Sequence, residues 1–160
     1  MLISNATTIF FDFDGVIKDS VRVKSEAFEK LFSSFGDKAS KKVRRHHESN
    51  GGMSRFEKIP IYLEWVNLPS TPIVVGKFSN EFSKLVMQKV IDSEWVPGVL
   101  NFIENNYKIK NLFIVTATPQ SEIEEIISRI GIAKCFKKII GSPTNKSDAV
   151  SSIVDKFNIN

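Results

Sequence analysis

The sequence predicts an α/β fold with a parallel sheet, into which a helical segment is inserted after the first strand. Two observations support this prediction. Short β-branched and aromatic runs alternate with helical patterns at both ends of the chain, and residues 20–95 contain no convincing strand pattern. Strands that alternate with helices are joined by right-handed crossovers, so we expect the strands to lie parallel in one sheet.

The core elements follow from local composition. A strand buried on both faces of a parallel sheet shows consecutive apolar residues, and three runs fit this pattern: residues 8–11, 111–116 and 138–141. Between the second and third runs, Pro119 is expected to open a helix that ends before Gly131. A last helix is predicted from Lys146 to Phe157, because Val150, Ile153, Val154 and Phe157 recur at helical spacing.

Residues 20–95 are expected to form a helical cap domain, and residues 1–19 and 96–160 an α/β core. Apolar stripes at helical spacing indicate the helices of the cap. The stripes comprise Ala27, Phe28, Leu31, Phe32 and Phe35, then Phe56, Ile59, Tyr62, Leu63 and Val66, and finally Phe78, Phe82, Leu85 and Val86. Turn chemistry around residues 19–20 and 94–98 predicts the two linkers.

Composition limits the class of protein. The chain has 160 residues, 42% hydrophobic and 25% charged, and its 22 Lys and Arg against 18 Asp and Glu leave a charge of +4. The basic run at residues 41–45 is therefore interpreted as a solvated face. The single cysteine, Cys135, favours a reducing compartment. The N-terminal stretch has no basic leader and reaches an acid at Asp12. We expect a cytoplasmic protein that binds neither nucleic acid nor membranes.

Two carboxylates follow the first predicted strand. Asp12 and Asp14 stand at its carboxyl end, where open α/β sheets place their ligands. A turn that begins at Asp14 and Gly15 can offer one carboxylate and one backbone carbonyl to a shared ion. Magnesium prefers such hard oxygen ligands and keeps several waters, so the pair predicts a Mg²⁺ site.

The segment Phe11–Ile17, followed by Asp19 and Ser20, resembles the first motif of the haloacid dehalogenase superfamily of phosphatases. Within it, the chain is most similar to the phosphoglycolate phosphatase and β-phosphoglucomutase-like subgroup with a helical cap. The resemblance implies a Rossmann-like core and Mg²⁺ as cofactor. It also implies that Asp12 attacks phosphorus, while Asp14 acts as general acid and then as base.

Two further motifs of this family have matches in the expected order. The second is a Ser or Thr at the end of the next core strand, and Thr116 matches it; Ala117 and Thr118 follow. The third is a Lys that opens a later helix, and Lys146 matches it. The resemblance implies that Thr116 and Lys146 are catalytic, while Gly15, Ala117 and Thr118 line the substrate site. Hydroxyl and backbone N–H groups can hold phosphate oxygens, and an ammonium balances their charge.

The cap segment with Gly52, Ser54 and Arg55 is expected to contact the substrate. Glycine lets the backbone approach a ligand, and the guanidinium of Arg55 can bind a second anionic group. A solvated or ion-paired arginine is the alternative for Arg55. The predicted ligand is a small phosphorylated metabolite.

The fourth motif of the family, an acidic pair that completes the magnesium site, has no match after Lys146. The sequence therefore predicts a core that is truncated at its C-terminus, with weakened metal binding and an open sheet edge that favours self-association. The main hypothesis is a Mg²⁺-dependent phosphatase. One alternative is a catalytically impaired domain that binds phosphate or a partner. Another is a phosphomutase.

Overall fold

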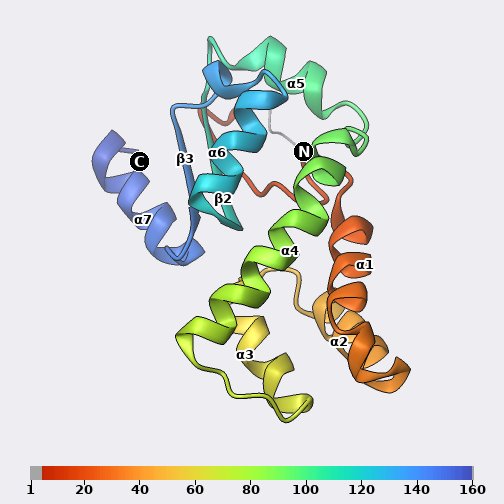
Figure 1. The fold of residues 1–160 in the computed structure, drawn as a ribbon. Coiled ribbons are helices and arrows are strands. Elements are labelled where there is room, and N and C mark those ends of the chain that lie inside the picture. Colours follow the sequence, from red (N-terminus) through yellow and green to blue (C-terminus); the bar gives the residue numbers. More distant parts are fainter. Residues whose placement is uncertain (1–4, 160) are drawn as a thin grey trace. The chain divides into compact units, whose positions relative to one another are not determined.

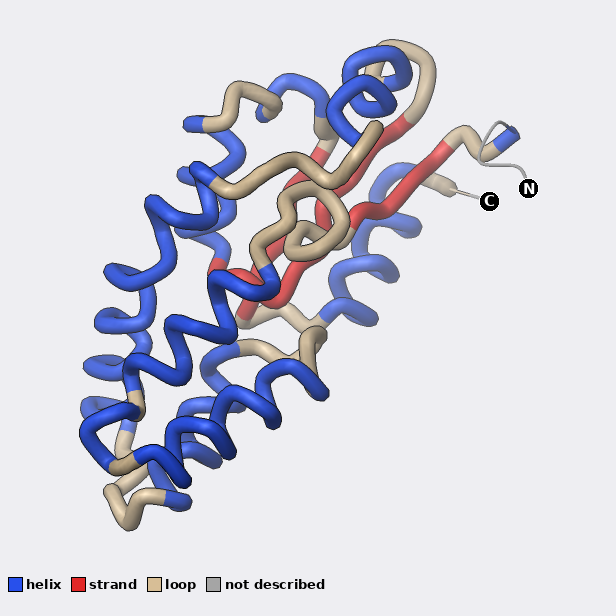
Figure 2. Tube along the Cα trace, turned by 90° about the vertical axis from the view of Figure 1, so that its right-hand side faces the viewer, coloured by secondary structure: helices blue, strands red, loops and turns tan. Residues whose placement is uncertain are grey.

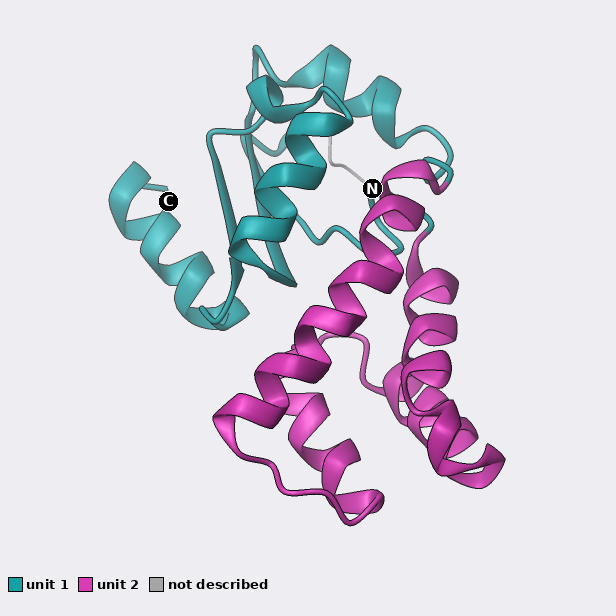
Figure 3. Ribbon diagram, in the orientation of Figure 1, with its two compact units in different colours: residues 1–19, 94–160 teal, residues 20–93 magenta. Residues whose placement is uncertain are grey.

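The computed structural model describes residues 5–159 and divides into two compact units (Figure 3). The core unit comprises Met1–Asp19 and Glu94–Asn160, and the helical unit comprises Ser20–Ser93. The first boundary lies between Asp19 and Ser20. The second lies two residues earlier than predicted, because the backbone of Trp95 pairs with Lys18 of the core unit.

The core unit contains a three-stranded parallel sheet, which confirms the predicted fold class (Figures 1 and 2). Strand β2 (Asn111–Pro119) lies between β1 (Thr8–Phe11) and β3 (Lys138–Ser142). The register pairs Thr8 with Asn111 and Phe113 with Lys138. The central strand is almost entirely buried, as the consecutive apolar residues of a parallel strand require.

Helix α7 (Lys146–Phe157) has the predicted bounds and covers one face of the sheet. Its buried Ala149 and Ile153 pack against Phe113 and Val115, which are two residues apart and point to the same face of β2. Among its described residues, the core unit also contains α5 (Val99–Asn106), α6 (Gln120–Arg129) and the 3₁₀ turn η3 (Ala133–Cys135). Helix α6 buries Ile123, Ile126 and Ile127 and contacts β2 and β3.

Strand β2 extends three residues beyond the prediction, and its pairing with β3 is irregular between Val115 and Pro119. The side chain of Gln120, the first residue of α6, bridges this irregular part. Its Oε1 accepts the backbone N–H of Gly141 at 2.6 Å, and its Nε2 donates to the carbonyl of Ile139 at 3.1 Å. The side chain thus replaces missing ladder hydrogen bonds where β2 leaves the sheet.

Gly141 is expected to tolerate no side chain. A Cβ atom at this position would lie 2.4 Å from the carbonyl oxygen of Thr118 and 2.9 Å from the backbone of Gln120. Because these contacts are with backbone, Gly141→Ala should lower the free energy of unfolding by about 1–3 kcal/mol in urea titrations. In the control Gly51→Ala, the new Cβ meets nothing within 4 Å, so a change within about 0.5 kcal/mol is expected. Equal stabilities of the two variants would contradict the prediction.

The helical unit contains four α-helices among its residues 20–93. These are α1 (Val21–Leu31), α2 (Asp37–Ser49), α3 (Arg55–Trp65) and α4 (Pro72–Asp92), with a 3₁₀ turn η2 (Ser33–Phe35) between the first two. Aromatic rings form its interior, where Phe28 lies 4.0 Å from Phe82 and 5.4 Å from Tyr62 between ring centroids. Within residues 5–159, no helix is both long and apolar enough to cross a membrane.

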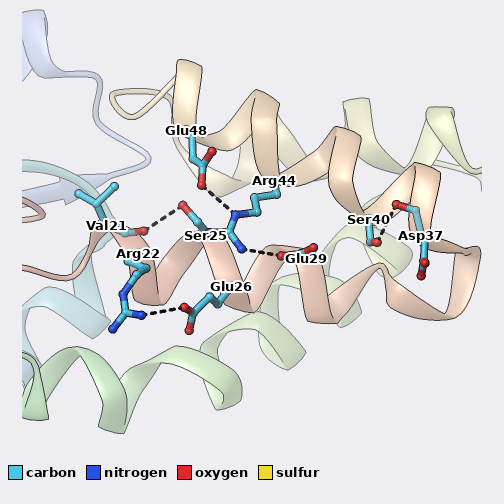
Figure 4. Close-up of polar contacts among 9 residues, drawn as sticks. All are labelled: Val21, Arg22, Ser25, Glu26, Glu29, Asp37, Ser40, Arg44 and Glu48. Atoms are coloured by element: carbon cyan, nitrogen blue, oxygen red, sulfur yellow. Dashed lines mark hydrogen bonds and ion pairs between the residues drawn. The ribbon is translucent and has the colours of Figure 1, made fainter.

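The basic run at residues 41–45 lies on α2, and one of its members ties α2 to α1 (Figure 4). Arg44 donates to Glu29 of α1 at 2.8 Å and to Glu48 of its own helix at 2.9 Å. These hydrogen bonds raise the pKa of the Arg44 guanidinium, so the arginine stays charged. This member of the run therefore pairs with acids of the same unit.

One member of a predicted apolar stripe lies outside the buried face of its helix. Phe56 was expected in the core of the cap, but its side chain is 41% exposed. Helix α3 instead buries Arg55 and Lys58 together with Ile59, Tyr62 and Leu63. The buried face thus contains three predicted residues, but it includes two long cationic side chains, which an apolar pattern does not count, in place of Phe56.

Protonation of His46 is expected to weaken the helical unit in mild acid. Its Nδ1 lies 3.0 Å from the hydroxyl of Tyr62, and burial, followed by the charges of Lys58 and Lys42, lowers its pKa below the ordinary 6.5. The unfolded chain then binds this proton more readily, so stability should fall as the pH decreases below 6.5. Urea unfolding at several pH values should show that the free energy of unfolding depends less on pH in His46→Gln than in the natural protein. An NMR titration of His46 with a pKa above 6.5 would contradict this.

Candidate active site

Asp12 and Lys146 meet at the carboxyl end of the sheet although 134 positions separate them. Asp12 follows the last residue of β1, and Lys146 is the first residue of α7, which Asn145 caps by accepting the N–H of Asp148 at 2.8 Å. The Nζ of Lys146 lies 2.5 Å from Oδ2 of Asp12, and Oδ1 of Asp12 accepts the N–H of Phe13 at 2.7 Å. The carboxylate is thus held from two sides.

This ion pair is open to solvent. The side chain of Lys146 is 39% exposed and that of Asp12 is 36% exposed. A pair that water screens to this extent contributes at most about 1 kcal/mol to stability. Its position instead allows an incoming anionic group to reach both side chains.

Asp14 lies on a short loop, residues 13–18, whose two ends are joined by backbone hydrogen bonds. The carbonyl of the buried Phe13 accepts the N–H groups of Ile17 at 2.8 Å and Lys18 at 3.2 Å, and the N–H of Gly15 donates to the carbonyl of Lys18 at 2.7 Å. Gly15 has a φ of 74°, which a residue with a Cβ rarely adopts. The backbone of the loop is therefore defined by its own hydrogen bonds.

The second predicted motif lies on β2 and reaches Asp14. Thr118 donates through Oγ1 to Oδ2 of Asp14 at 3.3 Å, and its own N–H donates to Oγ1 of Thr116 at 3.2 Å. Both threonines are almost fully buried, and Ala117 between them is half-buried. The structure thus brings together Asp14 with Thr118, and Asp12 with Lys146, from distant parts of the chain. The contact of Thr118 with Asp14 follows only from the extension of β2 beyond Thr116.

The predicted cap residues lie in the helical unit, around the start of α3. Gly52 is exposed in the turn before this helix. Ser54 caps the helix, because its N–H and its hydroxyl donate to Oε2 of Glu57 at 2.9 and 2.7 Å. These two hydrogen bonds lower the pKa of the Glu57 carboxyl. A Ser followed three residues later by Glu is a capping-box pattern, so the sequence already contains a structural role for Ser54.

Arg55 is only 5% exposed and is held by α4. Its Nη1 donates to the hydroxyl of Ser83 at 2.7 Å, and its guanidinium carbon lies 4.6 Å from the ring centroid of Phe82. Sequence reasoning missed a second buried cation one turn later. Lys58 is 1% exposed, and its Nζ lies 2.9 Å from Nδ1 of His47. Arg55 and Lys58 are three residues apart and therefore lie on one face of the helix, and this spacing is the signal that could have indicated the burial of Lys58.

The donors at the sheet edge suit a magnesium ion in their chemistry. Asp12 has a carboxylate, and the backbone of Asp14 has a carbonyl oxygen. Mg²⁺ commonly binds one or two protein oxygens, with water and substrate phosphate as its other ligands. Over residues 5–159, no three or more His, Cys, Asp or Glu side chains are grouped so that they could hold a metal ion.

Comparisons with known proteins identify the family and the fold of the chain. The family model of haloacid dehalogenase-like hydrolases matches residues 9–160. A phosphorylated carbohydrates phosphatase of Thermotoga maritima is 27% identical over 135 residues, which are 82% of this chain and 59% of that protein. The chain thus spans about three fifths of that relative's length.

Two solved structures show the same fold. A β-phosphoglucomutase of Clostridium difficile has a TM-score of 0.72 and 21% identity, over 97% of this chain and 72% of that one. A HAD hydrolase of Bacillus subtilis, described as bound to magnesium, has a TM-score of 0.61 and 16% identity, over 86% of this chain and 65% of that one.

Proposed function

Because this chain belongs to the haloacid dehalogenase-like hydrolases, we propose that it is a phosphatase of small phosphorylated metabolites, with phosphorylated carbohydrates as the substrate class. The observation that carries the proposal is the contact between Lys146 and Asp12 at the carboxyl end of β1. A carboxylate beside an ammonium, both accessible, suits attack on a phosphoryl group whose charge the ammonium balances.

In the proposed reaction, a carboxylate oxygen of Asp12 attacks phosphorus while the bond from phosphorus to the leaving oxygen breaks. Asp14 donates its proton to that oxygen, and Thr118 orients its carboxyl group by the hydrogen bond to Oδ2. Asp14, now a carboxylate, takes a proton from water, and the resulting hydroxide attacks the phosphorus of the aspartyl-phosphate. Inorganic phosphate leaves, and both side chains return to their starting state.

The groups proposed to bind phosphate and metal lie in the core unit. Thr116 would hold a phosphate oxygen, because its hydroxyl accepts the N–H of Thr118 and keeps its own proton to donate. Gly15, Ala117 and Thr118 are proposed to line the substrate site beside it. Asp12 and the carbonyl of Asp14 would hold Mg²⁺, which when bound neutralises charge on the phosphoryl group.

Three residues of the helical unit, Gly52, Ser54 and Arg55, are proposed to select the substrate. Arg55 is held by Ser83 and Phe82 and offers a fixed guanidinium that suits a second anionic group.

The test is ³¹P NMR of the purified protein with a panel of sugar phosphates and phosphorylated acids. We expect inorganic phosphate from at least one compound, lost on chelation with EDTA and restored by Mg²⁺. A new phosphate ester in place of inorganic phosphate would indicate a phosphomutase, which shares the first half of the reaction. No turnover of any compound, with phosphate still bound, would overturn the proposal in favour of a binding domain.

A further inference from the structure

The loop that carries Asp14 is paired with the segment by which the chain re-enters the core unit. Lys18 and Trp95 form an antiparallel bridge, flanked by hydrogen bonds from the N–H of Asp19 to the carbonyl of Glu94 at 2.8 Å and from the N–H of Val96 to the carbonyl of Ile17 at 3.1 Å. Two short segments, residues 17–19 and 94–96, therefore act as paired strands outside the main sheet.

The two side chains at the centre of this pairing are a buried lysine and the tryptophan ring on which it stacks. Lys18 is only 3% exposed, and its Nζ lies 4.5 Å from the centroid of the Trp95 ring. Removal of an ammonium from water is costly unless other groups compensate it, and the face of a tryptophan ring is the best aromatic partner for a cation. The stacking of Lys18 on Trp95 therefore adds to the backbone bridge and resists displacement of either residue.

The backbone of Lys18 connects this stack to Asp14. Its carbonyl accepts the N–H of Gly15 at 2.7 Å, and its N–H donates to the carbonyl of Phe13 at 3.2 Å. Asp14 lies between these two bonded residues in the sequence. A shift of Lys18 would therefore move both peptide groups that flank Asp14.

We propose that Lys18 and Trp95 are a positioning pair that holds the loop of residues 13–18 so that Asp14 can transfer a proton to the leaving oxygen. The inference rests on the proposed function, in which Asp14 is the general acid. Neither member of the pair needs to touch the substrate, because each acts through the backbone on either side of Asp14.

The first test compares leaving groups. p-Nitrophenyl phosphate has a leaving group that needs no proton, whereas an alkyl phosphate requires a general acid. In Lys18→Met and Trp95→Leu, kcat/KM for the alkyl phosphate should fall by about 10- to 100-fold, and that for p-nitrophenyl phosphate by less than about threefold. Trp95→Phe, which keeps an aromatic face, should recover part of the loss. Equal losses on both substrates would indicate a merely structural role and overturn the proposal.

A second test does not depend on activity. Amide hydrogen exchange of Gly15 reports the hydrogen bond to the carbonyl of Lys18, and it should become at least about tenfold faster in Lys18→Met. The matched control is Lys108→Met, which removes another lysine stacked on an aromatic ring, at 5.7 Å from Tyr107. Unchanged exchange at Gly15 in Lys18→Met would overturn the proposal, whether or not the protein hydrolyses a phosphate ester. Accelerated exchange in a protein that hydrolyses no phosphate ester would count against the proposed function alone.

Discussion

Asp12→Asn is expected to lower the rate of phosphate release by at least about 10³-fold, the largest effect of any single substitution in this protein. The amide keeps the size of the carboxylate, and its oxygen can still accept the N–H of Phe13, which lies 2.7 Å from Oδ1 of Asp12. The NH₂ group that replaces Oδ2 cannot accept the hydrogen bond from Lys146. The amide lacks the negative charge needed to attack phosphorus. Because Asp12 is 36% exposed, the variant should fold as the natural protein does.

Phosphate release should be measured on the best substrate of the panel with saturating Mg²⁺. Asp155→Asn, in an exposed position of α7, is the matched control and should keep full activity. ¹⁹F NMR with beryllium fluoride should show an adduct in the natural protein and none in Asp12→Asn. Mass spectrometry of Asp12→Asn excludes deamidation back to aspartate. A variant that keeps more than a tenth of the rate would remove Asp12 from the role of nucleophile.

Lys146→Met should lower kcat/KM by about 10²–10³-fold. The ammonium of Lys146 is the basic group that contacts Asp12 within the core unit, at 2.5 Å from Oδ2. Methionine keeps most of the length of the side chain and removes its charge, so the negative charge that builds up when the phosphoryl group meets Asp12 is no longer balanced. The effect on stability should stay below about 1 kcal/mol, because both side chains are well exposed.

Two further variants isolate the role of the charge at this position. Lys146→Arg keeps the charge but not the compact ammonium, and we expect it to recover only part of the activity. Lys156→Met removes a charge from the last turn of the same helix and should leave the kinetics unchanged. If Lys156→Met were as damaging as Lys146→Met, overall charge rather than the local contact would explain the loss.

Local sequence patterns predicted much of the core unit. The three strands were predicted from short runs of consecutive apolar residues, and α7 was predicted from apolar residues at helical spacing. The pairing of Asp12 with Lys146 also followed from the sequence, through the resemblance of its motifs and the rule that parallel strands end at the same edge of a sheet. These inferences succeed because short-range periodicity and chain direction suffice to place the elements.

The helical unit and the details of the site required the tertiary structure. The burial of Arg55 and Lys58 in place of Phe56 depends on which neighbouring helices surround α3, and hydrophobicity alone assigns the opposite preference. The contact of Thr118 with Asp14 arises because β2 extends past its regular pairing, and the bridge between Lys18 and Trp95 joins residues 77 positions apart. Contacts of this kind depend on the free energy of long-range packing, which no local pattern encodes.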